Sequence, residues 1–249
     1  MGRRALRACG YDLVYFAADN PGTFHRYPYA NQGSFFEDLN GRGYVPKTVV
    51  DIGANHGSWS VDLANVFTDV TSILVEPQEE LTDHLKALAN RHAGWKVAPV
   101  GIAGEDGVRR FQACDDTVSS SFLKGDDDPE DGGDIRELQV VTLDRLVGDY
   151  ADGQKIDIVK IDAEGLEAEI LKSGPKTISN ADIVMLEVAF FEFNKDQPKF
   201  SHLVSLMSDF GFSIYDFTMF YRRPHDGALG LMDCVFVSNT CSLRSSHAW

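Results

Sequence analysis

The sequence predicts an α/β protein built on a doubly wound, mostly parallel sheet. Short runs rich in β-branched residues alternate with segments whose apolar residues recur at helical spacing, which is the order of a sheet covered by helices. Ligands of such sheets bind beyond the carboxyl ends of the strands. The 249 residues, 43% of them hydrophobic, suffice for one core and one domain. Four of the runs end at an acid that could face a ligand: Asp51, Glu76, Asp162 and Glu187.

The first half of the chain is expected to supply three strands and two helices. The strands are expected at residues 48–51, 71–77 and 95–103, and an extended peripheral segment at 108–111. Apolar residues at i, i+4, i+7 and i+8 predict the helix after the first strand, and a leucine repeat predicts the next one. These residues are Trp59, Leu63, Val66 and Phe67, followed by Leu81, Leu85 and Leu88.

The second half repeats the pattern and closes with an antiparallel pair. A strand at 140–146 runs into a short helix that Thr142 can cap. Further strands are expected at 156–162 and 181–188, and the turn at 163–165 leads into a helix. A helix also precedes the last two strands, 212–216 and 232–237, which we expect to pair with each other. The total is about seven strands with interposed helices.

We expect one folded domain at residues 47–240, preceded by an N-terminal segment (1–46) and followed by a tail (241–249). Phe35, Phe36 and Leu39 predict a short helix in the N-terminal segment, which is either a cap on the sheet or a lid over the site. The acidic run 126–134 resembles a calcium loop only in part. Asp131 stands where the EF-hand requires glycine, so we expect a solvated, mobile loop instead.

Composition narrows the classes of partner. The formal net charge of −15 argues against nucleic acid and against an anionic membrane surface. No apolar run approaches the length of a membrane span, and no signal-peptide core follows the basic N-terminus. Cys9, Cys114, Cys234 and Cys241 show no metal-ligand spacing and read as reduced thiols, so a cytoplasmic location is expected. The oligomeric state stays open, a homodimer included.

The turn after the first strand indicates a nucleotide-sized ligand. Gly53 and Gly57 allow the backbone to turn sharply and to approach that ligand. Glu76 follows Gly53 by 23 positions, where a carboxylate can accept hydrogen bonds from two ribose hydroxyls. This spacing suits both NAD and S-adenosylmethionine. The turn favours the latter, because Asn55 replaces the second glycine of a dinucleotide fingerprint and Asp51 would repel a pyrophosphate.

The chain resembles the FkbM-family methyltransferases in four successive motifs. These are residues 50–57, Glu76-Pro77, residues 141–144 and residues 160–167. The resemblance implies a class I, Rossmann-like methyltransferase fold with a seven-stranded sheet. It also implies methyl transfer from S-adenosylmethionine, usually to a hydroxyl oxygen. Family substrates include sugar and polyketide hydroxyls, so we expect a small hydroxylated acceptor of the natural-product type.

The resemblance also implies where the cofactor lies. Four residues of the first turn should surround its amino-acid end, and Glu76 should hold its ribose. Two further residues are placed to flank the adenine, with a serine as an additional candidate near it. The residues at the amino-acid end are Asp51, Gly53, Asn55 and Gly57. The two residues that flank the adenine are Pro77 and Ile102, and the serine is Ser120.

Methyl transfer to a hydroxyl requires a base or an orienting group. Asp162 and Glu164 lie at the centre of the sheet's carboxyl edge and are the leading candidates, with His56 and His225 as further ones. A divalent metal held by Asp162, Glu164 and Glu187 is open but not predicted. Two other functions remain alternatives, an NAD(P)-dependent oxidoreductase and a non-catalytic domain that binds S-adenosylmethionine.

Overall fold

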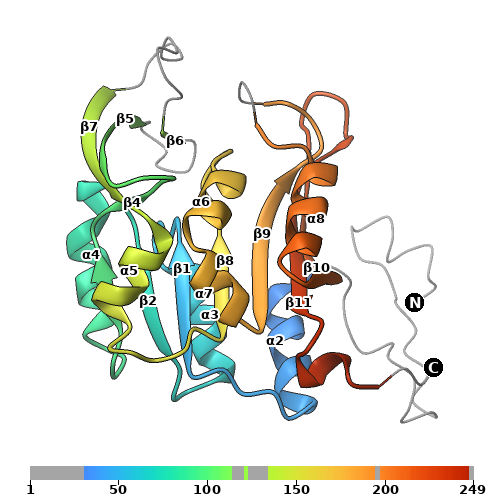
Figure 1. Cartoon of the computed structure of the whole chain (residues 1–249). Coiled ribbons are helices and arrows are strands. Elements are labelled where there is room, and N and C mark those ends of the chain that lie inside the picture. Colours follow the sequence, from blue (N-terminus) through green and yellow to red (C-terminus); the bar gives the residue numbers. More distant parts are fainter. Residues whose placement is uncertain (1–30, 114–120, 123–133, 194–196, 247–249) are drawn as a thin grey trace, which may run out of the picture.

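The computed structural model describes residues 31–113, 121–122, 134–193 and 197–246. Its centre is one seven-stranded sheet, which confirms the predicted fold class (Figure 1). β11 runs antiparallel to both of its neighbours, as expected for the C-terminal pair, and the other pairings are parallel. In spatial order the strands are β10 (Phe212–Arg222), β11 (Leu229–Ser238), β9 (Ile183–Ala189), β8 (Ile158–Ile161), β1 (Thr48–Ile52), β2 (Thr71–Val75) and β3 (Lys96–Ala98).

The strand order reverses beside β1. The chain moves outward from β1 through β2 to β3 and then returns to β8 on the other side of β1. Such a switch point opens a crevice at the carboxyl ends of the two central strands, because the connections leave them in opposite directions. The topology therefore places the ends of β1 and β8 at the natural position for a ligand.

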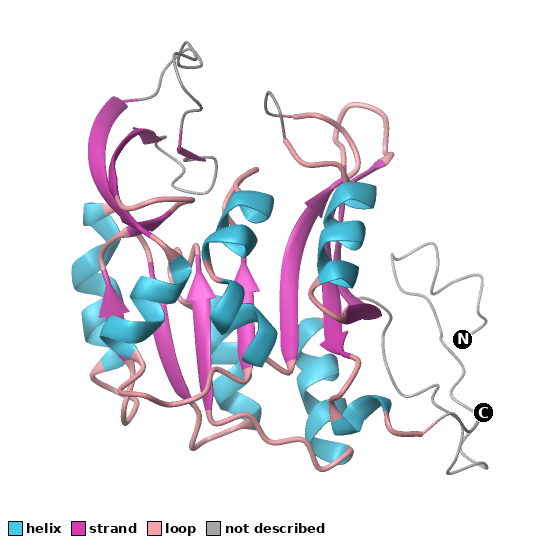
Figure 2. Cartoon of the chain, in the orientation of Figure 1, coloured by secondary structure: helices cyan, strands magenta, loops and turns pink. Residues whose placement is uncertain are grey.

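Helices cover both faces of this sheet (Figure 2). Val49 and Val50 are both fully buried, but they belong to separate core clusters, because successive residues of a strand point to opposite faces. The cluster with Val49 contains residues of α2 (Gln32–Gly41), α3 (Ser58–Val66) and α4 (Glu79–Ala89). The cluster with Val50 contains residues of α5 (Leu143–Tyr150), α6 (Glu167–Ser173), α7 (Pro175–Asn180) and α8 (Phe200–Asp209).

A second, four-stranded sheet was not predicted. It contains β4 (Gly101–Ile102), β7 (Asp134–Val141), β5 (Gly107–Ala113) and β6 (Ser121–Phe122), in that order. The single strand expected at 95–103 is therefore two strands in two sheets, and the strand expected at 140–146 belongs to the second sheet. Pro99 separates β3 from β4, and it has no N–H with which to continue a ladder. Figure 1 shows this sheet beyond the carboxyl ends of the central strands.

The flanking segments are described in part. The predicted N-terminal helix is present as α2, whose cap Asn31 accepts a hydrogen bond from the N–H of Ser34. Residues 1–30 lie outside the described residues, so the choice between cap and lid stays a prediction. Most of the acidic run also lies outside them, although Asp134 begins β7. The tail contains the 3₁₀ turn Ser242–Arg244. No helix in the described part of the chain is both long and apolar enough to cross a membrane.

Candidate active site

A cavity of about 810 Å³ opens at the carboxyl edge of the central strands. This volume lies in the range typical of cofactor and small-molecule sites. Its walls come from the turns after β1, β2 and β8, from the ends of β9, β10 and β11, and from the small sheet. Most of the residues predicted from the sequence line it: Gly53, Asn55, Glu76, Pro77, Ile102, Asp162 and Glu164.

The turn after β1 is held in an unusual backbone conformation. Gly53 has φ 73° and Asn55 has φ 47°, both in the left-handed region that glycine and asparagine tolerate best. A Cβ on Gly53 would lie 1.8 Å from the backbone oxygen of Asp162, so only glycine fits between the two turns. The N–H groups of Gly53 and Ala54 both donate to the carbonyl of Val75 at 3.0 Å. The turn is therefore fixed against the ends of β2 and β8.

Gly57, predicted beside the amino-acid end of the cofactor, lies behind the turn. It does not line the cavity, and it precedes α3 with φ 77°, a conformation that ends the turn and starts the helix. An added Cβ would approach the Leu88 side chain to 2.5 Å. Gly57 therefore shapes the turn from behind, while Gly53 and Asn55 face the cavity.

Glu76 is suited to hold the ribose of a nucleoside. Its side chain is 4% exposed and lines the cavity. The N–H of Asn55 donates to its Oε2 at 2.9 Å, and the N–H of Gln78 donates to its Oε1 at 3.0 Å. The Gln78 side chain also hydrogen-bonds this carboxylate, so two ribose hydroxyls would have to replace that bond to use both remaining acceptor sites. Burial raises its pKa, although the two backbone hydrogen bonds and the Gln78 side chain oppose this effect.

Asp51 lies behind the cavity wall. It is fully buried, and it is not among the residues that line the cavity. Ser60 Oγ donates to its Oδ2 at 2.8 Å, and its Oδ1 faces the ammonium of Lys160 at 3.5 Å. Burial raises its pKa, and Lys160 opposes this effect. The predicted influence of Asp51 on the amino-acid end of the cofactor would thus pass through Lys160 and the turn.

The part of the cavity beside Pro77, where the adenine is predicted, is mainly apolar. Pro77, Val100 and Ile102 line it together with Phe111 and Phe122, whose rings meet edge to face at 4.9 Å between centroids. The two phenylalanines come from β5 and β6, and the sequence reading missed them because their strands have distant partners. A flat, uncharged base fits such a slot. Ser120, the additional candidate at this end, lies outside the described residues.

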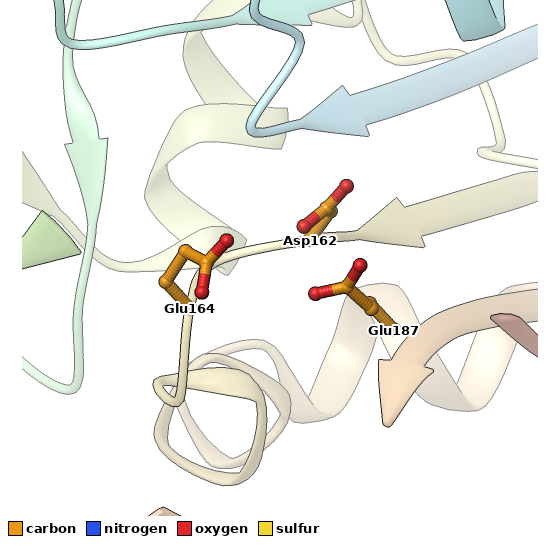
Figure 3. Close-up of side chains that lie close together, drawn as sticks. All are labelled: Asp162, Glu164 and Glu187. Carbon is orange, nitrogen blue, oxygen red and sulfur yellow. The ribbon is translucent and has the colours of Figure 1, made fainter. Parts of the chain in front are cut away.

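Three carboxylates converge on the opposite side of the cavity (Figure 3). Asp162 follows β8, Glu164 lies in the next turn with φ 49°, and Glu187 projects from β9. Each offers an oxygen, and these oxygens lie within 4.8 Å of one another. Lys160 places its ammonium 3.1 Å from Asp162 and 3.5 Å from Asp51, so this one cation is shared between two carboxylates.

Glu167 organises the turn that carries these acids. Its Oε1 accepts from the N–H of Gly165 at 3.0 Å and from the N–H of Ala163 at 3.3 Å. Helix α6 begins only at Glu167, after the cap Leu166, so Asp162 does not cap it. The carboxylate of Asp162 is free to face the cavity instead.

The pKa values of the acids on this side of the cavity are raised by burial and by the neighbouring carboxylates. Burial raises the pKa of Glu187 to about 9, with further contributions from Asp162, Glu164 and Asp233. Burial also raises the pKa of Asp233 to about 6, and nearby Asp162 adds to that shift. Lys160 opposes both shifts. At neutral pH Glu187 is therefore mainly protonated, whereas Asp233 is mainly ionised.

Asp233 is a site residue that the sequence reading missed. It pairs with Glu187 across the β9–β11 ladder, and both line the cavity. Glu187 and Asp233 are close because their strands pair, and no pattern within either segment of the sequence indicates this. Met219, Tyr221 and Leu231 line the same side, so carboxylates stand beside an apolar wall.

The two histidines differ in position. His56 lines the cavity, where its ring meets that of His84 at 5.3 Å between centroids. His225 is exposed in the turn between β10 and β11 and does not line the cavity. The structure therefore does not bring His225 together with Asp162 and Glu164.

The chain matches one protein family and is similar to several solved structures. Residues 51–214 match the family described as "Methyltransferase FkbM domain". No curated protein matches the chain. Among solved structures, methyltransferase FkbM from Methylobacillus flagellatus KT is similar at 15% identity and a TM-score of 0.48, with 76% of this chain covered. The match spans only 43% of that protein.

Two further solved structures contain the cofactor or its product. Magnesium protoporphyrin IX methyltransferase from Synechocystis PCC 6803, with bound S-adenosylmethionine, is 15% identical with a TM-score of 0.49, and the match covers 83% of this chain and 77% of that one. 1,6-Didemethyltoxoflavin-N1-methyltransferase from Burkholderia thailandensis, with bound S-adenosylhomocysteine, is 14% identical with a TM-score of 0.45, at 85% and 79% coverage. At these identities the likeness concerns the fold alone.

The family match extends from Asp51, at the end of β1, to Ile214 in β10, and so includes the turn, Glu76 and the acids after β8. The cavity combines a turn that admits no Cβ, a buried carboxylate and an apolar slot. The chain belongs to the FkbM family of S-adenosylmethionine-dependent methyltransferases.

Proposed function

We propose that the protein is an O-methyltransferase that methylates a hydroxyl of a small molecule, such as a sugar or a polyketide-like natural product. The observation that carries this proposal is the acid-lined half of the cavity, where Asp162, Glu164, Glu187 and Asp233 surround one space beside the cofactor turn. Carboxylates accept hydrogen bonds from hydroxyl groups. They repel phosphates and carboxylates, so we expect a neutral or cationic acceptor.

The cofactor half of the cavity would hold S-adenosylmethionine, which supplies a methyl group on a sulfonium. Glu76 would accept from the ribose hydroxyls, and Pro77, Ile102 and the two phenylalanine rings would enclose the adenine. Gly53 and Asn55 would face the amino-acid end. The close packing of Gly53 against Asp162 supports a short path from this end to the acids.

We propose Asp162 as the base that takes up the proton of the acceptor hydroxyl. Its Oδ2 faces the ammonium of Lys160, so Oδ1 is the oxygen available to the acceptor hydroxyl. Glu187, whose pKa is raised to about 9, would donate a hydrogen bond to the acceptor at neutral pH. Asp233, whose pKa is raised to about 6, would accept one. Together these groups would orient a molecule with several hydroxyls, and Met219, Tyr221 and Leu231 would contact its apolar side.

The surroundings support a small-molecule acceptor. The net charge of −15 disfavours nucleic acid as a partner. Cys234 and Cys241 are buried free thiols, which is in keeping with a cytoplasmic location.

Family membership decides against an NAD(P)-dependent oxidoreductase. The acids beside the cofactor turn favour catalysis over binding alone, because a binding module has no need to cluster partly buried carboxylates.

The test is an acceptor panel built from matched pairs. The purified protein is incubated with S-adenosylmethionine and neutral sugars or macrolides, each paired with its phosphorylated or carboxylated analogue, and S-adenosylhomocysteine is quantified by mass spectrometry. We expect turnover only with neutral or amino-bearing hydroxyl compounds, lost in Asp162→Asn and kept in His225→Ala. Preference for the anionic member of a pair, or wild-type rates in Asp162→Asn, would disprove the proposal. Cofactor binding without turnover on any acceptor would favour the non-catalytic alternative.

A further inference from the structure

Lys160 stands between the two halves of the cavity. It is 9% exposed and lies in β8, in register with Asp51 of β1. Its ammonium is 3.1 Å from Asp162 Oδ2, 3.5 Å from Asp51 Oδ1 and 3.5 Å from the carbonyl oxygen of Gly53. Asp162 belongs to the cluster of acids, Asp51 to the strand β1, and Gly53 to the turn that follows β1. Lys160 is the only lysine or arginine among the described residues that line the cavity.

The two turns that Lys160 joins also touch through their backbones. The N–H of Asp162 donates to the carbonyl of Ile52 at 3.1 Å. The backbone oxygen of Asp162 fills the space that a Cβ on Gly53 would need. A displacement of either turn must therefore move the other or break this contact, so the ammonium acts on a packed pair of turns and not on two independent loops.

The charge of Lys160 is secure. Burial by itself would lower the pKa of this ammonium, but Asp162, Asp51 and Asp233 attract the proton, and the net result is a pKa well above the ordinary value. The side chain therefore stays a cation at any working pH of the protein.

We propose that Lys160 is a positioning residue that holds the Gly53 turn and the Asp162 carboxylate in one fixed arrangement, so that cofactor binding and the placement of the acid depend on each other. This inference rests on the proposed function only in assuming that the Gly53 turn binds the cofactor. The acceptor plays no part in it, so it can be tested with S-adenosylhomocysteine alone.

The experiment is a double-mutant cycle on the dissociation constant (Kd) of S-adenosylhomocysteine, measured by calorimetry. Lys160→Met keeps the bulk of the side chain and removes its charge, and we expect Kd to rise about tenfold because a charged hydrogen bond to the turn is lost. Asp162→Asn alone should raise Kd several-fold. In the Lys160→Met background it should change Kd by less than about twofold, because the path through the ammonium is already gone. Lys160→Arg, which keeps the charge, should fall between wild type and Lys160→Met.

Lys155→Met is the matched control. Lys155 also bonds a carboxylate, that of Asp182 at 2.7 Å, but near the other end of β8 and away from the cavity. Its replacement should leave Kd unchanged. If Lys160→Met is too unstable to purify, Asp51→Asn/Lys160→Met, which also neutralises the buried acid, is compared with Asp51→Asn, and the same tenfold ratio is expected.

Three results are distinguishable. Failure of the wild-type protein to bind S-adenosylhomocysteine would reject the proposed function. Normal binding by Lys160→Met, with only a lower melting temperature, would show that Lys160 is merely structural and would overturn the inference. Independent, multiplying effects of Lys160→Met and Asp162→Asn would overturn it as well, because they would mean that the two residues act on the cofactor separately.

Discussion

Replacing Glu76 with alanine tests the cofactor half of the cavity. The carboxylate is held by the N–H groups of Asn55 and Gln78, so it is already oriented before a ligand binds. Two ribose hydroxyls would each donate to a buried charged acceptor. At about 1.5 kcal/mol for each such bond, near the lower end of the usual range, the loss is about 3 kcal/mol. This corresponds to a rise in Kd for S-adenosylhomocysteine of roughly a hundredfold.

The same substitution leaves the two backbone N–H groups without their acceptor. We therefore expect the protein without ligand to lose stability, by about 1–3 kcal/mol for each donor that water does not reach. Calorimetry gives Kd, and thermal unfolding with and without ligand separates the loss of affinity from the loss of stability. Glu79→Ala is the control, because Glu79 is exposed in the first turn of α4 and does not line the cavity. A Kd within about threefold of wild type in Glu76→Ala would refute the assignment of Glu76 to the ribose, given the roughly hundredfold change expected.

Three other predictions follow from the acids and from the turn. Turnover should rise as pH increases through about 6, where Asp233 ionises, and should fall through about 9, where Glu187 loses its proton. Asp233→Asn should remove the rise near pH 6, and a turnover rate that does not change with pH would contradict these roles. The raised pKa of Glu187 means that the folded state holds this proton more tightly than the unfolded state, so it stabilises the fold at low pH and this stabilisation is lost as pH rises from the ordinary value of 4.5 towards 9. Glu187→Gln should therefore melt higher than wild type at pH 9 and no higher at pH 4.5, and the opposite order would show that the carboxylate is favourably paired. Gly53→Ala should abolish S-adenosylhomocysteine binding and lower the melting temperature sharply. The control Gly43→Ala, at a similar φ of 79° with no atom near the added Cβ, should lower the free energy of unfolding by only about 1 kcal/mol. Equal effects would mean that backbone strain, and not the contact with Asp162, makes Gly53 necessary.

Several features could be predicted because they depend on residues close together in the chain. The helix α2, the cap Thr142, whose hydroxyl accepts from the N–H of Arg145 at 3.4 Å, and the turn around Gly53 all follow from local chemistry. Glu76 was identifiable because the acid that follows β2 comes at a characteristic distance from the turn. Period-two and helical spacings place a side chain on a face of its own element, and that information is enough for an element order and a fold class.

Other features depend on which strands become neighbours. Residues 101–102 and 140–141 were expected in the main sheet, yet they pair with each other in a second one, and this sheet brings Phe111 and Phe122 to the cavity wall. Asp233 reaches Glu187 through the β9–β11 register, and His225 is carried away from the site by the turn of the same hairpin. Strand pairing is decided by long-range burial and hydrogen bonding, so a periodic pattern within one segment does not report it.

The sequence by itself determined the order of the elements, the glycine-bearing turn, the ribose acid and, through its four motifs, the family. Only the tertiary structure decided which acids share one space. In the sequence both Asp51 and Asp162 look like acids at the end of a strand, but Asp51 lies within β1 and is buried beneath Lys160, whereas Asp162 follows β8 and faces the cavity. The physical reason is that the free energy of a buried charge depends on its neighbours in space, and those neighbours come from strands that lie more than a hundred residues apart in the chain.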